Sequence, residues 1–345
     1  MTEYEKCREQ LQRTPRRWLV TGAAGFIGSN IVEELLRLGQ QVVGLDDFSS
    51  GHQRNLDQVQ AAVGVGAWSR FEMIRGDIRD ADACARACRG ADHVLHHAAI
   101  GSVPASIDDP LKAHDVNVTG TLRLMLVSRE AGVKRFVYAS SSAVYGDDAT
   151  LPKVESSLGH CLSPYAVTKL ADELYAQVVG RCFGLEAIGL RYFNIFGPRQ
   201  DPNGAYAAVI PKWIAAMMLG QDVIIFGDGE TTRDFCHVSD VVQANILAAT
   251  APSAVVVPGA VFNVARHGST TLNELYEILR SRLAPFHPHL AGARPVYRDF
   301  RVGDVRHSEA SIAAVGKALG YAPVHTVASG LDAALAWYRA NLGKP

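Results

Sequence analysis

A glycine-rich turn between an apolar segment and an amphipathic helix restricts the fold of this chain more than any other feature. Residues 17–46 read RWLVTGAAGFIGSNIVEELLRLGQQVVGLD, with Gly22, Gly25 and Gly28 between the first apolar segment and the helix. Gly22 permits a tight turn, Gly25 lets backbone N–H groups approach a pyrophosphate, and Gly28 lets the helix pack closely on a sheet. The segment is therefore predicted to form a strand, a turn, a helix and a second strand around a dinucleotide.

Apolar strand-like segments and helical segments continue to alternate up to residue 195. Further strands are predicted in FEMIRGD, HVLHHAA, RFVYASS and LEAIGLRYFNIFG, and helices at residues 80–89, 110–131 and 164–182. Strands that alternate with helices form a parallel sheet with helices on both faces. The sequence therefore predicts an α/β fold, a doubly wound parallel sheet of the Rossmann type, over residues 17–195.

The two ends of the chain depart from this alternation. Residues 2–13 are polar, good helix formers that Pro15 stops, so residues 1–16 are predicted to be a helical extension before the fold. Proline-bearing segments such as GPRQDPNGAYAAVIPKW predict a smaller, irregular C-terminal substrate lobe in residues 196–345, with segments near 236–265 returning to the first domain. Such a lobe would lie over the carboxyl edge of the sheet, where ligands of doubly wound folds bind.

Carboxylates and small residues follow the predicted strands. Asp46 ends the second strand 18 residues after Gly28, where a carboxylate accepts hydrogen bonds from a ribose diol and repels a 2′-phosphate. This pattern favours NAD over NADP as the cofactor. In GDIRD, Asp77 and Ile78 are candidates to meet the adenine, and residues 96–99 are candidates to line the pyrophosphate. The last two stretches, taken alone, are more typical of ordinary strand ends.

Composition excludes several kinds of partner. The 345 residues include 34 basic and 35 acidic side chains, a formal charge of −1, so no general field attracts nucleic acid or an anionic membrane. The N-terminus has no apolar core of the signal-peptide type, and no apolar run approaches the length of a membrane span. Six cysteines scattered singly indicate reduced thiols. We therefore expect a cytoplasmic protein with no nucleic-acid or membrane partner.

A metal site is the weakest candidate in the sequence. Cys84 and Cys88 are four positions apart on a predicted helix, and His93, His96 and His97 follow. The cysteines belong to an ordinary amphipathic pattern and the histidines flank a strand. We therefore interpret them as core thiols and strand-end imidazoles, and no metal is predicted.

The segment SPYAVTK places Tyr165 and Lys169 four residues apart at the start of a predicted helix, and therefore on one face. An ammonium group beside a phenol stabilises the phenolate, which suits such a pair to accept a proton. A lone Y-x-x-x-K pair is usually an ordinary surface pair. Because this one follows a dinucleotide turn and a polar strand end, we interpret it as catalytic.

With these motifs in order, the chain resembles the extended short-chain dehydrogenase/reductase family and, within it, the nucleotide-sugar 4-epimerases. The matching segments are TGAAGFIGSN, GDIRD, HHAA, SSSAVYG, SPYAVTK, LRYFNIFGPRQ, GDGETTRDF and RVGDVRHS, which span nearly the whole chain. GSVPASI, SPYAVTK, PNGAYAAVIPKW and the N-terminal extension are most similar to bacterial epimerases of UDP-N-acetylhexosamines and their uronic acids. The resemblance implies an isomerase of surface polysaccharide synthesis that inverts C4 through a 4-keto intermediate, with tightly bound NAD.

The resemblance also implies roles for single residues. It makes Tyr165 the base that removes the proton of the sugar 4-hydroxyl, and Lys169 the group that tunes Tyr165 and holds the nicotinamide ribose. Ser141, with Ser142 beside it, becomes the hydroxyl that binds the reacting oxygen, and the choice between the two stays open. The residues expected to bind the cofactor are Gly22, Gly25, Phe26, Ile27, Gly28, Asp46, Asp77, Ile78, Ala98, Ser140, Tyr165, Lys169 and Tyr192.

The resemblance implies a second set of residues for a UDP-sugar substrate. Arg233 and Arg301 are expected to hold the diphosphate, because bidentate guanidinium donors suit its geometry. The residues expected to bind substrate are Gly101, Ser102, Ser141, Ser142, Tyr165, Asn194, Ala208, Val209, Arg233, Arg301 and Ser308.

The end of the strand FVYASSSAVYG separates the alternatives by reaction class. Related 4,6-dehydratases and decarboxylases use an acid in the loop after this strand, because elimination of water needs a general acid. Here the matching positions are Ser141, Ser142 and Ala143, which favours an epimerase over a dehydratase. A third alternative is an NAD-binding scaffold protein without activity. Such proteins usually lose the tyrosine or the lysine, and both are present.

Substrate size is inferred from Ser308 in RVGDVRHS. Narrow-specificity hexose epimerases of this family have a bulky tyrosine at the matching position, and a serine leaves room for a 2-acetamido group. UDP-glucose 4-epimerase stays as the alternative. Arg306 and His307 are candidates to favour a C6 carboxylate, although solvated surface side chains are the preferred interpretation. The resemblance further implies a homodimer, formed through the helix after Asn117 and the helix that contains Tyr165.

Overall fold

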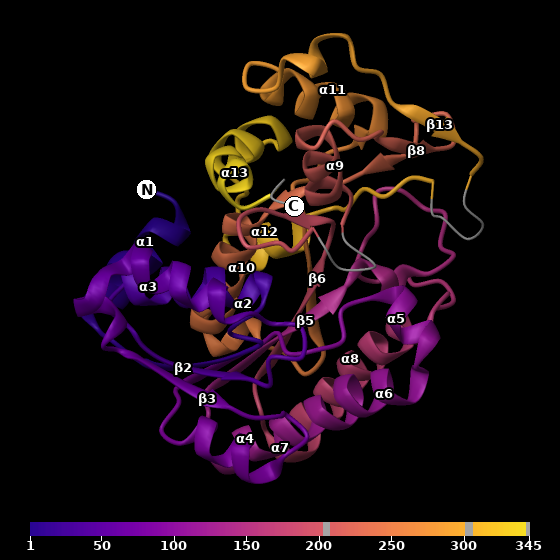
Figure 1. Cartoon of the computed structure of the whole chain (residues 1–345). Coiled ribbons are helices and arrows are strands. Elements are labelled where there is room, and N and C mark those ends of the chain that lie inside the picture. Colours follow the sequence, from indigo (N-terminus) through magenta and orange to yellow (C-terminus); the bar gives the residue numbers. More distant parts are fainter. Residues whose placement is uncertain (203–207, 301–305, 343–345) are drawn as a thin grey trace.

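The computed structural model describes residues 1–202, 208–300 and 306–342, and a parallel β-sheet forms its centre (Figure 1). The strands of this sheet are β1 (Arg17–Thr21), β2 (Gln41–Asp46), β3 (Phe71–Arg75), β4 (His93–His96), β5 (Arg135–Ser141), β6 (Ala187–Tyr192) and β11 (Ala260–Val264). They lie in the order β11-β6-β5-β4-β1-β2-β3, and every neighbouring pair is parallel. This order runs outward from β1 in both directions, so the predicted doubly wound fold is confirmed.

Helices cover both faces of the sheet (Figure 1). Alternate residues of a strand point to opposite faces, so in β1 Trp18 and Val20 lie in one core cluster and Leu19 in the other. The first face packs against α2 (Phe26–Arg37), α3 (Gln53–Trp68), α10 (Val238–Thr250), α1 (Glu3–Arg13) and α12 (Ala313–Leu319). The second face packs against α4 (Ala81–Cys88), α7 (Thr121–Glu130) and α8 (Pro164–Phe183). None of the helices in the described residues combines the length and apolar character that crossing a membrane requires.

Shorter helices lie beside α8 at the edge of the second face (Figure 1). They are α5 (Val103–Asp108), α6 (Pro110–His114) and a π-helical segment, Asp115–Gly120, that continues directly into α7. The helix predicted over residues 110–131 is therefore present but divided by this π-helical segment. The described residues also contain three 3₁₀ helices: Ser142–Tyr145, Ser253–Val255 and Pro288–Gly292.

A smaller lobe follows β6 and has a core of its own, in which Trp213, Leu275 and Leu331 are buried. Its helices are α9 (Val209–Met218), α11 (Leu272–Leu283) and α13 (Val327–Asn341). Its strands pair as β8 (Ile224–Phe226) with β13 (Val296–Arg298), β9 (Thr232–Arg233) with β12 (Thr270–Thr271), and β7 (Ile195–Phe196) with β10 (Cys236–His237). Between β10 and β12 the chain returns to the main sheet as α10 and β11. The domain boundaries set from the sequence stay predictions.

The cysteines and histidines considered for a metal site belong to the packed core. Cys84 and Cys88 are fully buried on the inner face of α4, as the amphipathic pattern predicted. His96 lies between two hydroxyls, with Nδ1 2.7 Å from Thr21 Oγ1 and Nε2 2.8 Å from Thr121 Oγ1. All six cysteines have free thiols. Across residues 1–202, 208–300 and 306–342, three or more His, Cys, Asp or Glu side chains nowhere form a group that could hold a metal ion.

Candidate active site

The turn between β1 and α2 is pressed against its neighbours at two glycines. Gly22 has φ of +66°, and a Cβ there would lie 2.9 Å from the backbone nitrogen of Ala98. A Cβ on Gly28 would lie 2.0 Å from the carbonyl oxygen of Gly22. A side chain at Gly22 would push the turn away from the segment after β4, and one at Gly28 would push α2 away from the turn, so only hydrogen fits at either position.

Asp46 is fixed at the end of β2. The residue is 6% exposed, and its carboxylate accepts hydrogen bonds from the backbone N–H groups of Ala24, at 2.9 Å, and Phe48, at 2.8 Å. Burial raises the pKa of Asp46, and the two N–H groups oppose that rise. A carboxylate offers about four acceptor positions, so about two remain for a ribose diol in the adjoining cavity.

A cavity of about 1080 Å³, here called the main cavity, extends from this turn to the ends of β4, β5 and β6. Pockets for drug-sized ligands have about 300–1,000 Å³, so the main cavity is at the upper end of this range and is large enough for an extended ligand such as a dinucleotide. The predicted cofactor residues that line it are Gly22, Gly25, Phe26, Ile27, Gly28, Asp46, Asp77, Ile78, Ala98, Ser140, Tyr165, Lys169 and Tyr192. The structure thus brings the whole predicted cofactor set together, and the role of each member stays a prediction.

Tyr165 and Lys169 lie in the first turns of α8. Ser163 caps this helix by accepting a hydrogen bond from the backbone N–H of Ala166 at 3.2 Å, and Pro164 occupies its first turn. Tyr165 is half-buried, while the Lys169 side chain is buried. Both line the main cavity. The helix start therefore places the phenol and the ammonium group on the same wall.

A buried carboxylate holds the Lys169 ammonium group and was not singled out by the sequence. Lys169 Nζ lies 3.2 Å from Asp172 Oδ2, with side chains 3% and 1% exposed. Burial raises the pKa of Asp172 to about 6, and the nearby Lys169 charge opposes that rise. The ammonium group has three hydrogens. Those not donated to Asp172 remain available toward the main cavity.

The three serines after the strand have different surroundings. The Ser140 hydroxyl donates to Glu173 Oε1 at 2.5 Å, so its hydrogen is unavailable to a cofactor. Ser141 accepts a hydrogen bond from the backbone N–H of Ala143 at 3.1 Å and caps the following 3₁₀ helix. Its hydroxyl hydrogen is then free to point elsewhere. Ser141 and Ser142 both line the main cavity, so the choice between them stays open.

Below these serines lies a buried ion pair that sequence reasoning missed. Arg191 of β6 donates from Nε to Glu173 Oε1 at 2.9 Å and from Nη2 to Glu173 Oε2 at 2.8 Å. Its Nη1 also donates to the hydroxyl of Tyr145 at 3.0 Å. Because Ser140 also donates to Glu173, the pair connects β6 with α8, which presents Tyr165, and with the end of β5, which presents the serines. The only sequence signal was the position of Glu173, four residues after Lys169 on the same helix.

Asn117 was also missed as a positioning residue. It lies in the π-helical segment, and its Oδ1 accepts a hydrogen bond from the Ile100 N–H at 2.8 Å. Its Nδ2 donates to Thr168 Oγ1 of α8 at 3.0 Å. Asn117 thus joins α8 to the loop that contains Gly101 and Ser102, both of which line the main cavity. π-Helical turns often occur at functional sites for such reasons.

A second cavity, of about 390 Å³, lies in the smaller lobe. The predicted substrate residues Asn194, Ala208, Val209 and Arg233 line it. The sequence did not predict its aromatic walls, which include Trp213 and Phe226. The two cavities meet, because Asn194, Ile195 and Gln200 line both. Asn194 has φ of +35°, an unusual backbone angle for a residue other than glycine.

Two predicted substrate residues, Arg301 and Ser308, are not among the described residues that line either cavity. Arg301 lies outside the residues that the structure describes. Ser308 is half-buried and donates its backbone N–H to the Thr232 carbonyl at 3.2 Å, beside β9. It is not among the described residues that line the main cavity or the lobe cavity. The structure therefore does not place Ser308 on the wall of either cavity.

Comparison with known proteins assigns the family. The protein-family model of the NAD dependent epimerase/dehydratase family matches residues 18–265. The chain belongs to this family. Among its relatives, a UDP-glucose 4-epimerase of Mycolicibacterium smegmatis is 36% identical over 325 residues, which are 94% of this chain and 98% of that protein.

Solved structures of family members agree in fold. The UDP-N-acetylglucosamine 4-epimerase of Methanobrevibacter ruminantium, in complex with UDP-N-acetylmuramic acid, is 36% identical, with a TM-score of 0.86 over 95% of this chain and 99% of that one. A dTDP-glucose 4,6-dehydratase of Streptomyces venezuelae with NAD bound is 32% identical, with a TM-score of 0.82 over 94% and 97%. The resemblance drawn from the motifs is confirmed. The homologues of this chain include UDP-sugar 4-epimerases, which are isomerases.

NAD is the cofactor of the family, as the sequence predicted. The residues present fit it: the Gly22 turn leaves room only for hydrogen at two positions, the start of α2 faces the main cavity, and the Asp46 carboxylate stands at the end of β2. These are the donors and acceptor that a pyrophosphate and a ribose diol need.

Proposed function

We propose that the protein is an NAD-dependent 4-epimerase of a UDP-N-acetylhexosamine or of the corresponding uronic acid. The observation that carries this proposal is the end of β5, where Ser141, Ser142 and Ala143 share the main cavity or its border with Tyr165 and include no carboxylate. A 4,6-dehydratase among the relatives has the same fold, so likeness of fold does not choose between the two reactions. The chemistry at this position does, because elimination needs an acid that a serine cannot replace.

The reaction needs a base at the sugar 4-hydroxyl. Tyr165 takes this proton, and the Lys169 charge on the same wall favours the phenolate that makes the transfer possible. A serine hydroxyl, from Ser141 or Ser142, holds the same oxygen as it becomes a ketone and then an alcohol again. When bound, NAD supplies the acceptor and the later donor of the C4 hydride. Tyr165 returns the proton at the end, so the side chains are unchanged after each turnover.

Inversion requires that the sugar present both faces to the cofactor. The two joined cavities support such a movement, since a UDP group held in the lobe cavity leaves the sugar at the junction near Asn194. Trp213 and Phe226 provide apolar surface for a base, and Arg233 is a donor for the diphosphate. We propose Arg301 as the second diphosphate donor. Fixing the nucleotide while leaving the sugar few partners permits rotation about the diphosphate linkage.

The acetamido preference rests on Ser308 and on a relative. The Methanobrevibacter ruminantium relative at 36% identity is named as a UDP-N-acetylglucosamine 4-epimerase. Ser308 lies beside β9, and a serine there occupies less space than a tyrosine would. Arg306 forms a 2.6 Å ion pair with Asp228, and both side chains are about half exposed, which supports the interpretation of Arg306 as a surface residue. UDP-glucose is the second candidate substrate, because a relative at 36% identity bears that name.

An assay with purified protein tests the substrate class. Without added NAD, the protein is expected to interconvert UDP-GlcNAc with UDP-GalNAc, or UDP-GlcNAcA with UDP-GalNAcA, with higher kcat/KM than it converts UDP-glucose. The products are separated by ion-exchange chromatography. Conversion of UDP-glucose alone would contradict the acetamido preference, and a 4-keto-6-deoxy product would contradict the epimerase assignment.

We propose that two copies associate through an apolar face on α8. Val167, Leu174 and Val178 lie along one side of α8, and these residues are 54%, 56% and 49% exposed. Leu111 of the neighbouring α6 is 82% exposed. α7, the other helix named from the sequence, exposes only Arg129 and Glu130. The face therefore favours α8 with α5 and α6, in a two-fold arrangement that buries the same patch on both copies.

Light scattering after size exclusion measures this association. The protein is expected to have twice the monomer mass, and Leu174→Asp to reduce it to the monomer because a charge would be buried. The control is Val65→Asp on α3, because Val65 is 81% exposed and α3 covers the other face of the sheet. A dimer that persists in Leu174→Asp would exclude this face.

A further inference from the structure

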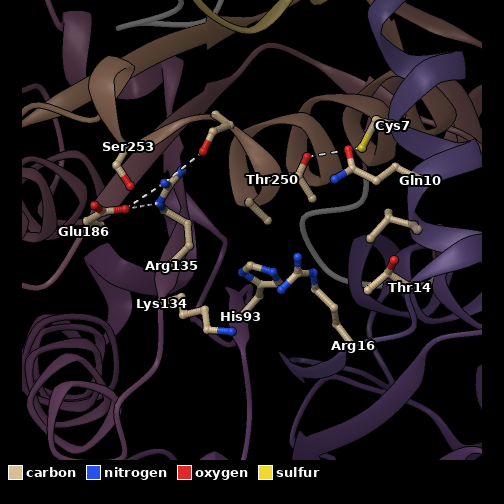
Figure 2. A pocket seen from close by; sticks show the side chains of 13 residues that line it. Cys7, Gln10, Thr14, Arg16, His93, Lys134, Arg135, Glu186, Thr250 and Ser253 are labelled. Carbon is tan, nitrogen blue, oxygen red and sulfur yellow. Dashed lines mark hydrogen bonds and ion pairs between the residues drawn. The ribbon is translucent and has the colours of Figure 1, made fainter.

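A separate cavity of about 210 Å³, here called the basal cavity, lies at the amino ends of the central strands (Figure 2). It is bounded by α1, by the first residues of β4 and β5, and by the end of α10. β5 runs from Arg135 in the basal cavity to Ser141 in the main cavity. At about 3.3 Å per residue, the two cavities are about 20 Å apart. The basal cavity is therefore no part of the NAD or substrate site.

His93, the first residue of β4, is a buried side chain without a partner. It is 5% exposed, and neither ring nitrogen has a hydrogen-bond partner within the described part of the chain. One side of the ring packs on Trp18, with ring centroids 4.5 Å apart. Buried polar atoms are nearly always hydrogen-bonded, and no described protein group bonds this ring, so its nitrogens are available to a molecule that enters the cavity.

Arg16 is the second group without a partner. Its guanidinium lies beside the His93 ring in the basal cavity (Figure 2). Across residues 1–202, 208–300 and 306–342, the Arg16 side chain forms no hydrogen bond or ion pair, although it is only half exposed. Burial and the Arg16 charge lower the pKa of His93 to about 4, with smaller effects from Asp92, Arg135 and Lys134. The imidazole is thus neutral at pH 7 and has one N–H to donate.

The remaining charges around the basal cavity are paired with one another. Lys134 forms a 2.7 Å ion pair with Asp92, and Arg135 a 2.7 Å ion pair with Glu186. Arg135 also donates to two carbonyl oxygens at the end of α10, those of Ala248 at 2.8 Å and Ala251 at 3.0 Å. Asp92 and Glu186 thus already pair with Lys134 and Arg135. Arg16 is the cation at the basal cavity that has no acidic partner among the described residues. The ligand that satisfies Arg16 and His93 together is an anion.

We propose that the basal cavity binds a phosphate group, from inorganic phosphate or a small phosphorylated metabolite, with Arg16 and His93 as the principal donors. A guanidinium group donates two parallel hydrogen bonds to a phosphate. The phosphate then still has an oxygen that can accept a hydrogen bond from the His93 N–H. The cavity is smaller than the 300–1,000 Å³ typical of sites for drug-sized ligands. It therefore suits a phosphate with a short organic group and not a nucleotide.

Calorimetric titration with inorganic phosphate tests the proposal. The protein is first saturated with NAD and UDP, so that phosphate cannot enter the main or lobe cavity, and ionic strength is kept constant with chloride. One saturable site is expected. Arg16→Ala should weaken its affinity at least about tenfold, because a charge-assisted hydrogen bond is lost. A second titration uses sn-glycerol 3-phosphate, and the tighter ligand of the two identifies the source of the phosphate group.

Two further variants separate binding at this site from a general effect of charge. Arg13→Ala removes the same charge from α1 at a side chain that is 80% exposed, lies outside the cavity and pairs with Glu9, and it should leave the affinity unchanged. His93→Phe keeps a ring against Trp18 but removes both nitrogens, and it should weaken binding as Arg16→Ala does. Absence of saturable binding, or equal affinity in the wild type, Arg16→Ala and Arg13→Ala, would overturn the proposal. The Arg16 side chain forms no hydrogen bond or ion pair within the described residues, and Arg16→Ala keeps the backbone hydrogen bonds to Gln40 and Gln41, so this variant decides the result even if His93→Phe does not fold.

Discussion

Replacing Tyr165 with phenylalanine is expected to lower kcat for sugar epimerisation by about 10³-fold while the protein stays folded and keeps its NAD. The phenol is the group on the wall of the main cavity that can take the 4-hydroxyl proton, and the variant removes only its oxygen. Its ring, its place in the first turn of α8 and the capping of that helix by Ser163 are retained. Steady-state rates, together with the absorbance of bound cofactor, measure the two effects separately.

The matched control is Tyr175→Phe on the same helix. Tyr175 is 41% exposed and lies outside both cavities, so removal of its hydroxyl should leave kcat within about a factor of two, since surface changes have small effects. If Tyr165→Phe retained more than a tenth of the activity, the base assignment would be wrong. A Tyr165→Phe protein that lost NAD would indicate a structural role for the hydroxyl instead.

Local sequence signals predicted the sheet-forming part of the chain well. The helices expected at residues 80–89 and 164–182 begin at Ala81 and Pro164, where Asp80 and Ser163 cap them. Such signals depend on near neighbours in the chain and so survive folding. The helix Gln53–Trp68 was not predicted, because its end contains Gly64, with φ of +79°, and a second glycine that weakens the helical pattern.

The smaller lobe was predictable only in outline. Its strands are two or three residues long, as in Ile224–Phe226 and Thr232–Arg233. A period of two cannot be recognised in so short a segment, so proline content was the only sequence signal. The aromatic walls of the lobe cavity, Trp213 and Phe226, come from different elements that meet only in the folded chain.

Within the candidate site, too, local patterns were predicted and contacts between distant segments were not. The glycine turn and the Tyr165–Lys169 pair are local patterns, and each was placed correctly on its element. Asn117 and Thr168, whose side chains are hydrogen-bonded, are 51 residues apart, and no sequence pattern links them. The ion pair between Glu173 and Arg191 was missed for the same reason, because the two residues meet only when α8 packs on β6. Partners that support a site from below thus require the structure.

Replacing Glu173 with glutamine is expected to lower the free energy of unfolding by about 3–5 kcal/mol, the typical cost of removing one partner of a buried ion pair. The side chains of Arg191 and Glu173 are 4% and 7% exposed, and water cannot readily reach the guanidinium left behind. In the glutamine variant one carboxylate oxygen becomes an NH2 group, so either Arg191 Nη2, or Ser140 together with Arg191 Nε, faces a donor in place of an acceptor. The midpoint of urea unfolding, followed by circular dichroism, measures the change.

The surface pair between Arg282 and Asp332 provides the control. Its side chains are 21% and 59% exposed, so Asp332→Ala should cost less than about 1 kcal/mol. Replacing both partners of the buried pair, as Glu173→Gln with Arg191→Met, should recover part of the loss, because no uncompensated charge then stays in the core. Equal losses for Glu173→Gln and Asp332→Ala would contradict the view that the Glu173–Arg191 pair holds the serine end of β5 against α8. A stable Glu173→Gln protein with reduced kcat would instead restrict the pair to positioning the serines.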